Sequence, residues 1–424
     1  MASASNVDRQ PVYTNDREQL IYLLTEAAEI EQGLMCSYLY AAWSLKQSVS
    51  EGLTEKQLAA INGWRDSIQS VAMEEMLHLA LVSNLLMSLG SPPHFMRPNF
   101  PVAPGYHPSS IVARLTPFTR DAADHFVYLE RPEGMALPQA KGFESGIRYQ
   151  RDRGETRLTP TAEDYDTVGH LYRGIEDGFR ILAEKLGEKG LFLGDPQAQI
   201  SAEVLDFTGL TAVTDLDSAI AAILTVIEQG EGGRQDAEQS HYARFRAIRD
   251  EYDIFLKEDP GFQPHRPVVS DPVMFRPITD QGTVHVSARP AARVLDLANA
   301  TYGLMLRLLA SGFGMASGSS ITRRIEIESA IAVMTIMKSL ALLLTTLPAD
   351  DSAQTAGMNF HLPRSTLALP QRHAGTALLA ERAREIANAL NDLGKEVPGA
   401  DGSLAHRLSS VAERLRQAAN RDGA

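Results

Sequence analysis

Glutamates inside the apolar faces of long helical patterns limit most strongly what this chain can fold into. Residues 14–45 contain no proline and repeat apolar side chains at helical spacing. Because a helix advances by about 100° per residue, Glu31 shares a face with Leu24, Leu34 and Tyr38. A buried carboxylate is costly unless it is paired, protonated or bound to a metal. The fold must therefore supply a partner for Glu31.

The same arrangement recurs in residues 51–89, where a second long helix is expected. Thr54 is placed to cap its N-terminus and Gly90 to end it. Glu75 lies on the apolar face of this pattern, and His78 follows three residues later. Side chains at that spacing can converge on one point beside the helix. Glu75 and His78 are therefore a candidate pair of metal ligands.

A second pair with this spacing, Glu238 and His241, lies on the helix expected over residues 235–256. Glu238 has a simpler explanation, because acids are favoured in the first turn of a helix whatever their function. Glu231 competes with it, since it follows the apolar face of the helix expected over residues 215–229. We keep both carboxylates as candidates for this part of the site.

The helix expected over residues 161–186 offers Glu176, at the border of its apolar stripe. His170 and Tyr172 are alternatives on the same helix. With Glu176 included, the chain order becomes Glu, Glu-x-x-His, Glu, Glu-x-x-His, which is typical of helix bundles that hold two metal ions. Oxygen ligands with imidazole nitrogen favour iron, with manganese as the second choice. For Glu31 alone, pairing with an Arg or Tyr side chain is the simpler explanation.

The rest of the chain predicts a mainly α protein in two helical parts. Six prolines within residues 260–290 indicate a linker or covering segment. We expect domains at residues 1–259 and 291–424, on either side of it. Further helices are expected over residues 291–311, 321–347, 374–394 and 402–419.

Composition narrows the partners and the compartment. The chain of 424 residues carries a formal net charge of −13, so nucleic acid is an unfavourable partner. The lone cysteine cannot form an internal disulfide, and residues 1–19 lack the apolar core of a secretory signal. The apolar run Ser329–Leu347 is interrupted by Lys338 and is interpreted as a buried helix rather than a membrane span. We expect a cytoplasmic protein with no membrane partner.

Several sequence segments together resemble a known family. They are EIEQGLMCSYLYAAWSLK, EEMLHLALVSNLLMSLGSPPHFMRPNFP, FVYLERPEG, AIAAILTVIEQGEG and SHYARF. They are similar to the ferritin-like family named after iminophenyl-pyruvate dimer synthase, over about residues 16–256, and TYGLMLRLL with TAGMNF extends the likeness beyond. The resemblance implies a ferritin-like four-helix bundle followed by an additional helical region. It also implies a metal centre containing Glu31, Glu75, His78 and His241, and draws attention to Glu228 and Glu231.

The function implied by this resemblance is that of a metal-dependent oxidative enzyme of specialised metabolism. We expect an O2-dependent non-heme di-iron oxidase or oxygenase, acting on a small aromatic amino-acid-derived substrate or its imine. The alternatives are a ferroxidase or iron-binding protein, and a ferritin-like binding scaffold without catalysis. The oligomeric state stays open, with a homo-oligomer allowed.

Overall fold

The computed structural model describes residues 12, 14–103, 105–107, 111–144, 158–160, 164–202, 204–205, 207–232, 238–276, 282–313, 320–364, 372–397, 400 and 402–423. Over these residues the protein is mainly helical, and its only sheet is a pair of two-residue parallel strands. The expectation of a mainly α fold, with further helices after the first helical part, is confirmed.

Within the described residues, the first part of the chain forms seven helices and three short helical turns. They are α1 (Arg17–Ser44), a 3-10 turn (Val49–Glu51), α2 (Glu55–Ser88), α3 (Arg120–Leu129), α4 (Val168–Leu186), α5 (Glu188–Leu191), a 3-10 turn (Pro196–Ala198), α6 (Leu216–Ile227), a π-helical turn (Glu228–Gly232) and α7 (His241–Glu258). The second part consists of β1 (Pro272–Val273), β2 (Val284–His285), α8 (Arg289–Gly312), α9 (Ser320–Leu344), α10 (Arg372–Leu393) and α11 (Gly402–Asp422).

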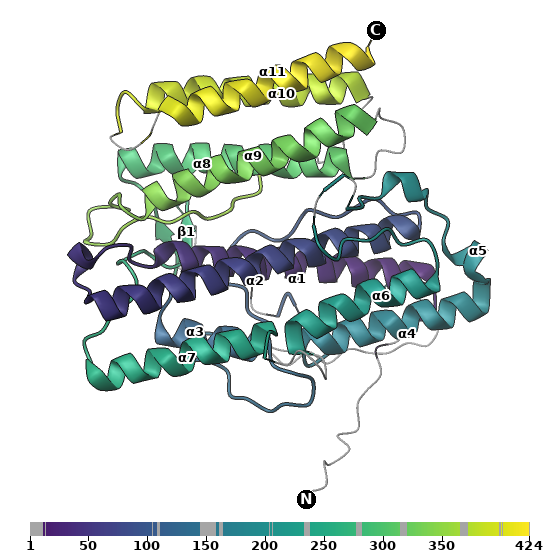
Figure 1. Ribbon diagram of the computed structural model, residues 1–424, viewed down its shortest axis with the longest axis horizontal. Coiled ribbons are helices and arrows are strands. Elements are labelled where there is room, and N and C mark those ends of the chain that lie inside the picture. The colour runs from purple at the N-terminus through teal and green to yellow at the C-terminus, as the bar shows by residue number, and fades with distance from the viewer. Residues whose placement is uncertain are drawn as a thin grey trace, which may run out of the picture.

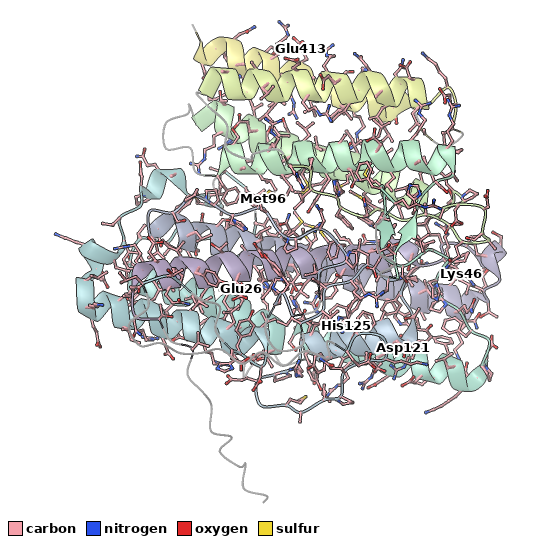
Figure 2. The ribbon with its side chains drawn as sticks, turned by 180° about the vertical axis from the view of Figure 1, so that it is seen from behind. Glu26, Lys46, Met96, Asp121, His125 and Glu413 are labelled. Carbon is pink, nitrogen blue, oxygen red and sulfur yellow. The ribbon has the colours of Figure 1, made fainter. Side chains whose placement is uncertain are left out.

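These helices are stacked in layers, as Figure 1 shows. The order is α10–α11, then α8–α9, then α1–α2, and last a layer with α3 and α7 at one end and α4 and α6 at the other. In Figure 2 side chains fill the space between the layers, with Met96 between the α1–α2 pair and the C-terminal helices. The α1–α2 pair is therefore covered on both sides. A helix in that position must be apolar nearly all round, and α1 is buried along most of its length from Leu20 to Ser44.

Local sequence explains where the long helices begin and end. Thr54 caps α2 and forms a reciprocal capping box with Gln57. Gly90 follows the end of α2 with a φ of 89°, a left-handed conformation that glycine adopts without a steric penalty. Both features agree with their predicted roles.

Two predicted helix starts need correction, and one helix was not predicted. In the described residues α4 begins at Val168 rather than near residue 161, and α7 begins at His241 rather than near residue 235, because Thr167 and Ser240 cap them. Helix α3 was not predicted, because the prolines that precede and follow it made the region look irregular. Each of these differences affects the functional site.

The apolar helix near residue 330 lies between other helices. Over Ile321–Leu344 it is long and apolar enough to cross a membrane by length and composition, and half of its most apolar window is buried inside the protein. Helix α9 packs against α8 and α11. It is the only described helix that meets these length and composition criteria.

The proline-rich segment after α7 connects the two parts of the chain. Arg266 N–H donates to the carbonyl of Ser44 at the end of α1, and Val269 N–H donates to the carbonyl of Thr355. The hydroxyl of Tyr40 donates to the carbonyl of Val269. The segment is thus hydrogen-bonded to both helical parts, and the division into domains stays a prediction.

Candidate metal centre

Five acidic and histidine side chains meet at the layer that contains α3, α4, α6 and α7, between its two ends. Glu31 comes from α1, Glu75 and His78 come from α2, Glu130 ends α3, and His241 begins α7. All five are between 0% and 7% exposed. Ionisable groups this deeply buried require compensation by one another or by a bound ion.

The first group of ligand atoms consists of Glu31, Glu75 and His78. The Nδ1 atom of His78 lies 2.9 Å from Glu75 Oε2 and 3.3 Å from Glu31 Oε2. One potential ligand atom from each residue lies within 4.8 Å of the other two. The three side chains therefore form a compact set of oxygen and nitrogen donors.

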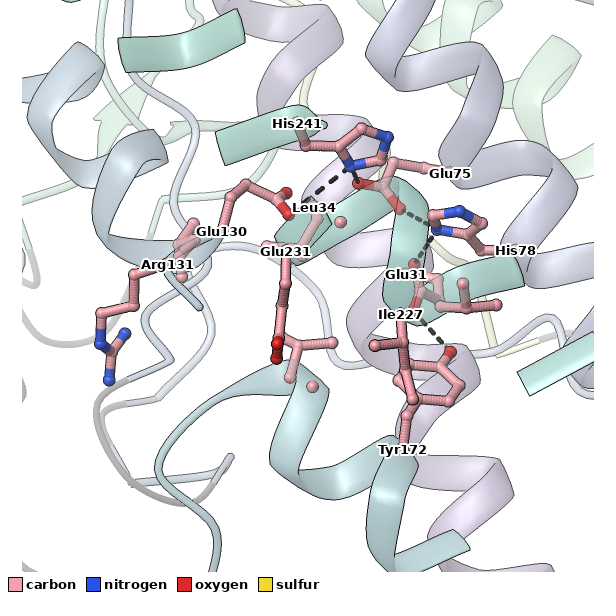
Figure 3. A pocket seen from close by; sticks show the side chains of 15 residues that line it. Glu31, Leu34, Glu75, His78, Glu130, Arg131, Tyr172, Ile227, Glu231 and His241 are labelled. Atoms are coloured by element: carbon pink, nitrogen blue, oxygen red, sulfur yellow. Dashed lines mark hydrogen bonds and ion pairs between the residues drawn. The ribbon is translucent and has the colours of Figure 1, made fainter. Parts of the chain in front are cut away.

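The second group consists of Glu75, Glu130 and His241. The Nδ1 atom of His241 lies 3.1 Å from Glu75 Oε1 and 3.5 Å from Glu130 Oε2. Figure 3 shows Glu75 between the two histidines, with one oxygen directed to each. Glu75 belongs to both groups, so one carboxylate could bridge two ions.

In each of the two groups, a tyrosine hydroxyl donates a hydrogen bond to the terminal carboxylate. Tyr172 donates to Glu31 Oε1 at 2.5 Å, and Tyr38 donates to Glu130 Oε1. Each terminal carboxylate thus has one oxygen fixed by a tyrosine and the other directed to the centre. Both tyrosine hydroxyls stay protonated, because burial and the neighbouring carboxylates raise their pKa well above the usual value.

The two histidines differ in the side chain that contacts the ring nitrogen facing away from the centre. His78 Nε2 lies 2.8 Å from the side-chain oxygen of Gln229, which is a neutral amide. His241 Nε2 lies 3.1 Å from Glu74 Oε2, a carboxylate that also pairs with Arg244. Such outer contacts fix the ring orientation and the tautomer of a ligand histidine, and leave Nδ1 free for a metal.

Protons occupy this centre when it holds no metal. Burial and the charge of Glu75 raise the pKa of Glu31 to about 8. Burial lowers the pKa of His78, but its hydrogen bonds to Glu31 and Glu75 outweigh this effect and raise the value to about 10. His241 also has a raised pKa, because Glu75 and Glu130 overcome the effect of burial. Metal binding would therefore release protons.

The residues present fit a pair of divalent cations. His241 Nδ1 is buried without a hydrogen-bond partner in the described part of the chain, although it faces two carboxylates. A nitrogen in that position has the orientation of an unused metal ligand. Three carboxylates and two imidazoles are the donor types that suit iron or manganese, and the lone cysteine, Cys36, belongs to neither group.

The structure brings together four of the seven ligands named from the sequence: Glu31, Glu75, His78 and His241. Glu176 lies outside both groups and pairs with Arg180 at 2.7 Å, one turn further along α4. The alternative His170 accepts from Asp166 N–H at 3.3 Å and is equally outside. The residue of α4 that reaches the centre is Tyr172, through its bond to Glu31.

Glu238 also lies outside the centre. It is exposed and precedes α7, so the helical spacing that would place it beside His241 does not exist. Glu231 lies on the wall of the pocket beside the centre, with Oε2 3.5 Å from Arg173 Nη2 and Oε1 without a hydrogen-bond partner among the described residues. Its carboxylate points away from His241 in Figure 3, and it belongs to neither group of described ligand atoms.

Glu130 is the functional residue that sequence reasoning missed. It lies in FVYLERPEG, one of the segments that carried the family resemblance. The signal was present, since Glu130 follows Phe126 and Val127 by four and three residues on the buried side of α3. Because α3 was not predicted as a helix, its terminal carboxylate was not considered.

Comparison with protein families agrees with this geometry. The model of the ferritin-like family matches residues 24–250, which contain all five residues of the centre. The chain belongs to the ferritin-like family. Among solved structures, this ferritin-like protein is similar to a ferritin-like protein from Caulobacter vibrioides at 18% identity and a TM-score of 0.43, covering 76% of this chain and 96% of that one.

Two curated enzymes are similar over most of the ferritin-like protein. Dichlorochromopyrrolate synthase of Lentzea aerocolonigenes is 29% identical over 413 residues, covering 88% of this chain and 39% of the relative. The 2-imino-3-(indol-3-yl)propanoate dimerase of Chromobacterium violaceum is 27% identical over 401 residues, covering 89% and 37%. These relatives confirm the predicted resemblance, and the chain spans about two fifths of their length.

Proposed function

We propose that this ferritin-like protein is an O2-dependent oxidoreductase that acts on a small aromatic amino-acid-derived substrate or its imine. The observation that carries the proposal is the pair of buried ligand groups sharing Glu75. The substrate class is suggested by the name of one relative, which is a dimerase of 2-imino-3-(indol-3-yl)propanoate.

Two iron ions are the proposed cofactor, with manganese as the second choice. One would be held by Glu31, Glu75 and His78, and the other by Glu75, Glu130 and His241. Bound iron would supply the redox chemistry by which O2 accepts electrons that the substrate loses. The five ligands would neutralise most of the added charge, since they include three carboxylates.

The surrounding side chains would keep these ligands in position and exclude water. Tyr172 and Tyr38 hold the outer oxygens of Glu31 and Glu130, so that neither carboxylate is free to rotate. Gln229 and Glu74 orient the two imidazole rings. Fixed, buried ligands are the arrangement that makes a reactive centre effective, because no reorganisation is needed during the reaction.

Substrate would approach from the side of the π-helical turn. The free space beside the ligands is only about 20 Å³, enough for a water-sized molecule but not for an aromatic ring. Its outer wall includes Arg131, Val168, Gly230 and Glu231. π-helical turns of this kind are frequent at functional sites, and we propose that an aromatic substrate lies against this wall, outside the ligands.

Arg131 is the group we assign to binding the substrate carboxylate. Its guanidinium lies over the Tyr128 ring at 3.8 Å and donates at 2.6 Å to the carbonyls of Tyr128 and Asp166. These contacts hold the side chain of Arg131, a residue that lines the pocket, without neutralising its charge. Arginine recognises carboxylates through paired donors, and an amino-acid-derived substrate carries one.

The test begins with the metal content of the purified full chain after anaerobic reconstitution with iron. We expect about two ions per chain in the wild type and a loss of both in the double variant Glu31→Ala, His78→Ala. Glu176→Ala is the matched control, because it removes a carboxylate of the same bundle that lies outside the centre. Wild-type protein that binds no metal would overturn the proposal.

Oxygen consumption then separates the enzyme from a ferroxidase. The iron-loaded protein is supplied with the imine of an aromatic 2-oxo acid, and substrate turnover should continue well beyond one O2 per centre. Consumption that stops once the iron is oxidised would favour a ferroxidase instead. The Arg131→Gln variant should raise KM for the imine about tenfold or more while leaving metal content unchanged, since a charge-assisted contact is lost.

A further inference from the structure

A second and much larger cavity lies on the opposite side of the α1–α2 pair. It has a volume of about 540 Å³ and is lined by residues of α1, α2, α8 and α9. No described residue lines both this cavity and the pocket beside the metal centre. The two spaces nevertheless share a wall, since Met35 and Met76 line the cavity while their chain neighbours Leu34 and Glu75 line the pocket.

The size and lining of this cavity are those of a small-molecule site. Protein interiors contain few voids larger than a water molecule, whereas ligand sites occupy roughly 300–1,000 Å³ and are mainly apolar. Six of the chain's 13 methionines line this one cavity: Met35, Met73, Met76, Met305, Met334 and Met337. Methionine side chains adapt to irregular shapes and contact aromatic rings favourably.

The mouth of the cavity is marked by apolar side chains that face solvent. Met73 of α2 is 50% exposed and Ile331 of α9 is 43% exposed, and both line the cavity. Between the same two helices, Lys338 Nζ donates to Gln69 Oε1 at 2.8 Å. Lys338 has no ion-pair partner among the described residues, so its charge is available to a ligand at the entrance.

The inner end of the cavity is also close to a positive charge. Tyr302 lines it, and the buried guanidinium of Arg97 lies 6.0 Å from the centre of that ring. Arg97 donates to the carbonyls of Phe360 and Pro98, at 2.7 Å each, and forms no ion pair within the described part of the chain. Among the described residues, the cavity lining contains no Asp or Glu. An anion beside these described residues would therefore meet positive charge without an opposing carboxylate.

We propose that this cavity binds an apolar molecule carrying one anionic group, a carboxylate or a similar acid, with that group at Lys338 and its apolar body among the methionines. The site is independent of the proposed chemistry, because none of its lining residues belongs to the metal centre. Two classes of ligand have this chemistry, fatty acids and aromatic acids. Binding experiments distinguish between them.

The first experiment titrates the full chain with anilinonaphthalene sulfonate, a fluorescent apolar anion, and with the neutral analogue N-phenyl-1-naphthylamine. We expect one anion per chain. Lys338→Gln should weaken binding of the anion by about three- to tenfold, as expected for the loss of a partly solvated ionic hydrogen bond, and leave the neutral probe unaffected. Lys189→Gln, an exposed lysine of α5, is the matched control and should change neither.

The second experiment fills the cavity. Met305→Trp places a large ring on the α8 wall, and Met73→Trp does so at the half-exposed mouth, where the fold has room to adjust. Both should abolish binding of both probes while thermal unfolding stays cooperative. Equal affinity and stoichiometry in wild type and Met73→Trp would overturn the proposal, as would a Lys338→Gln variant that binds the anion as the wild type does.

Competition identifies the class of natural ligand. Dodecanoate represents fatty acids and indole-3-propionate represents aromatic acids. Displacement of the fluorescent anion by either supports the proposal and assigns the source, and displacement by neither overturns it. Metal content is measured in parallel and should stay constant in Lys338→Gln and Met73→Trp, so that a failure here is distinguishable from a failure of the metal-centre proposal.

Discussion

The two faces of the α1–α2 pair show how one helical hairpin can carry two opposite environments. The face toward α3, α4, α6 and α7 gathers three carboxylates and two histidines around a space of about 20 Å³. The face toward α8 and α9 is lined by methionines and aromatic rings around about 540 Å³. The change from one environment to the other takes a single residue step, from Glu75 to Met76.

This contrast explains why α1, and α2 from Glu75 onward, are buried nearly all round. A surface helix needs one apolar stripe, but a helix between two layers needs a second. Buried polar groups on one stripe are tolerated only if each finds a partner, which the tyrosines, Gln229 and Glu74 supply here. The apolar stripe needs only side chains whose shapes pack together. The stability of the polar face therefore depends on individual partner residues, whereas that of the apolar face depends on the volume its side chains fill.

The largest expected effect tests that contrast at adjacent positions. Glu75→Gln removes the carboxylate shared by both ligand groups, so both metal ions should be lost, because an amide is a weak ligand and cannot bridge. Met76→Trp should leave the metal content at the wild-type value and abolish binding of anilinonaphthalene sulfonate. Elemental analysis and fluorescence titration of both variants measure this. Loss of metal in Met76→Trp, with folding intact, would mean that the two faces are not independent.

A second prediction compares the two metal positions. Glu74→Gln replaces the charged partner of His241 Nε2 by a neutral one, similar to the amide that His78 already has. Metal affinity at the His241 position should fall by roughly 10- to 100-fold, the usual effect of losing such an outer contact. Gln229→Leu should have the smaller effect, because it removes only a neutral acceptor. Competition with a chelator gives both affinities, and a larger effect from Gln229→Leu contradicts the assigned difference.

Much of the polar face could be predicted from the sequence, because a charge inside an apolar stripe is a strong local signal. Glu31, Glu75 and His78 were found in this way, on helices whose caps could also be recognised. Glu130 and the contact of Tyr172 with Glu31 could not, because the first depends on where the short helix α3 ends and the second on how α4 packs against α1. The start of α7 was predicted too early, and this produced the candidate Glu238, which lies outside the centre. Glu176, at the border of its apolar stripe, forms an ion pair with Arg180 instead.

The cavity on the apolar face could not be located from the sequence. Its methionines are ordinary core residues in the sequence, and nothing in their spacing distinguishes a filled core from a cavity. That distinction depends on how closely α8 and α9 approach α1 and α2, which is a property of tertiary packing. Local patterns report what a helix buries but not what fills the space beside it.

A third prediction tests close packing at the end of α1. A Cβ atom on Gly357 would lie 2.2 Å from Tyr40 Oη and 2.5 Å from its ring, and Tyr40 is buried. Gly357→Ala should destabilise the protein by about 1–3 kcal/mol, the cost of overpacking a filled interior, with metal stoichiometry unchanged. Denaturant unfolding gives the free energy. In the double variant Gly357→Ala, Tyr40→Ala the alanine should cost less, and an unchanged cost would exclude the contact as its cause.

The smallest effect concerns His125 of α3, which has no carboxylate contact among the described residues. Burial lowers the pKa of His125 to about 3, although its hydrogen bond to the Val112 carbonyl partly opposes this, and its ring stacks on Phe143. The unfolded chain therefore takes up a proton below about pH 6.5 that the folded chain does not. Its contribution to stability is lost as the pH falls from about 6.5 towards 3, by about 1.4 kcal/mol per pH unit.

His125→Phe should remove this slope while keeping the ring that stacks on Phe143. It also loses the bond to Val112, so we expect a lower stability at pH 7 but a shallower decline between pH 6.5 and 4 than in the wild type. Measuring the free energy of unfolding across that range gives the difference in slope. Equal slopes would mean that His125 is protonated in the folded state. The protonation of the histidines in this layer would then not depend on whether they face carboxylates or apolar side chains.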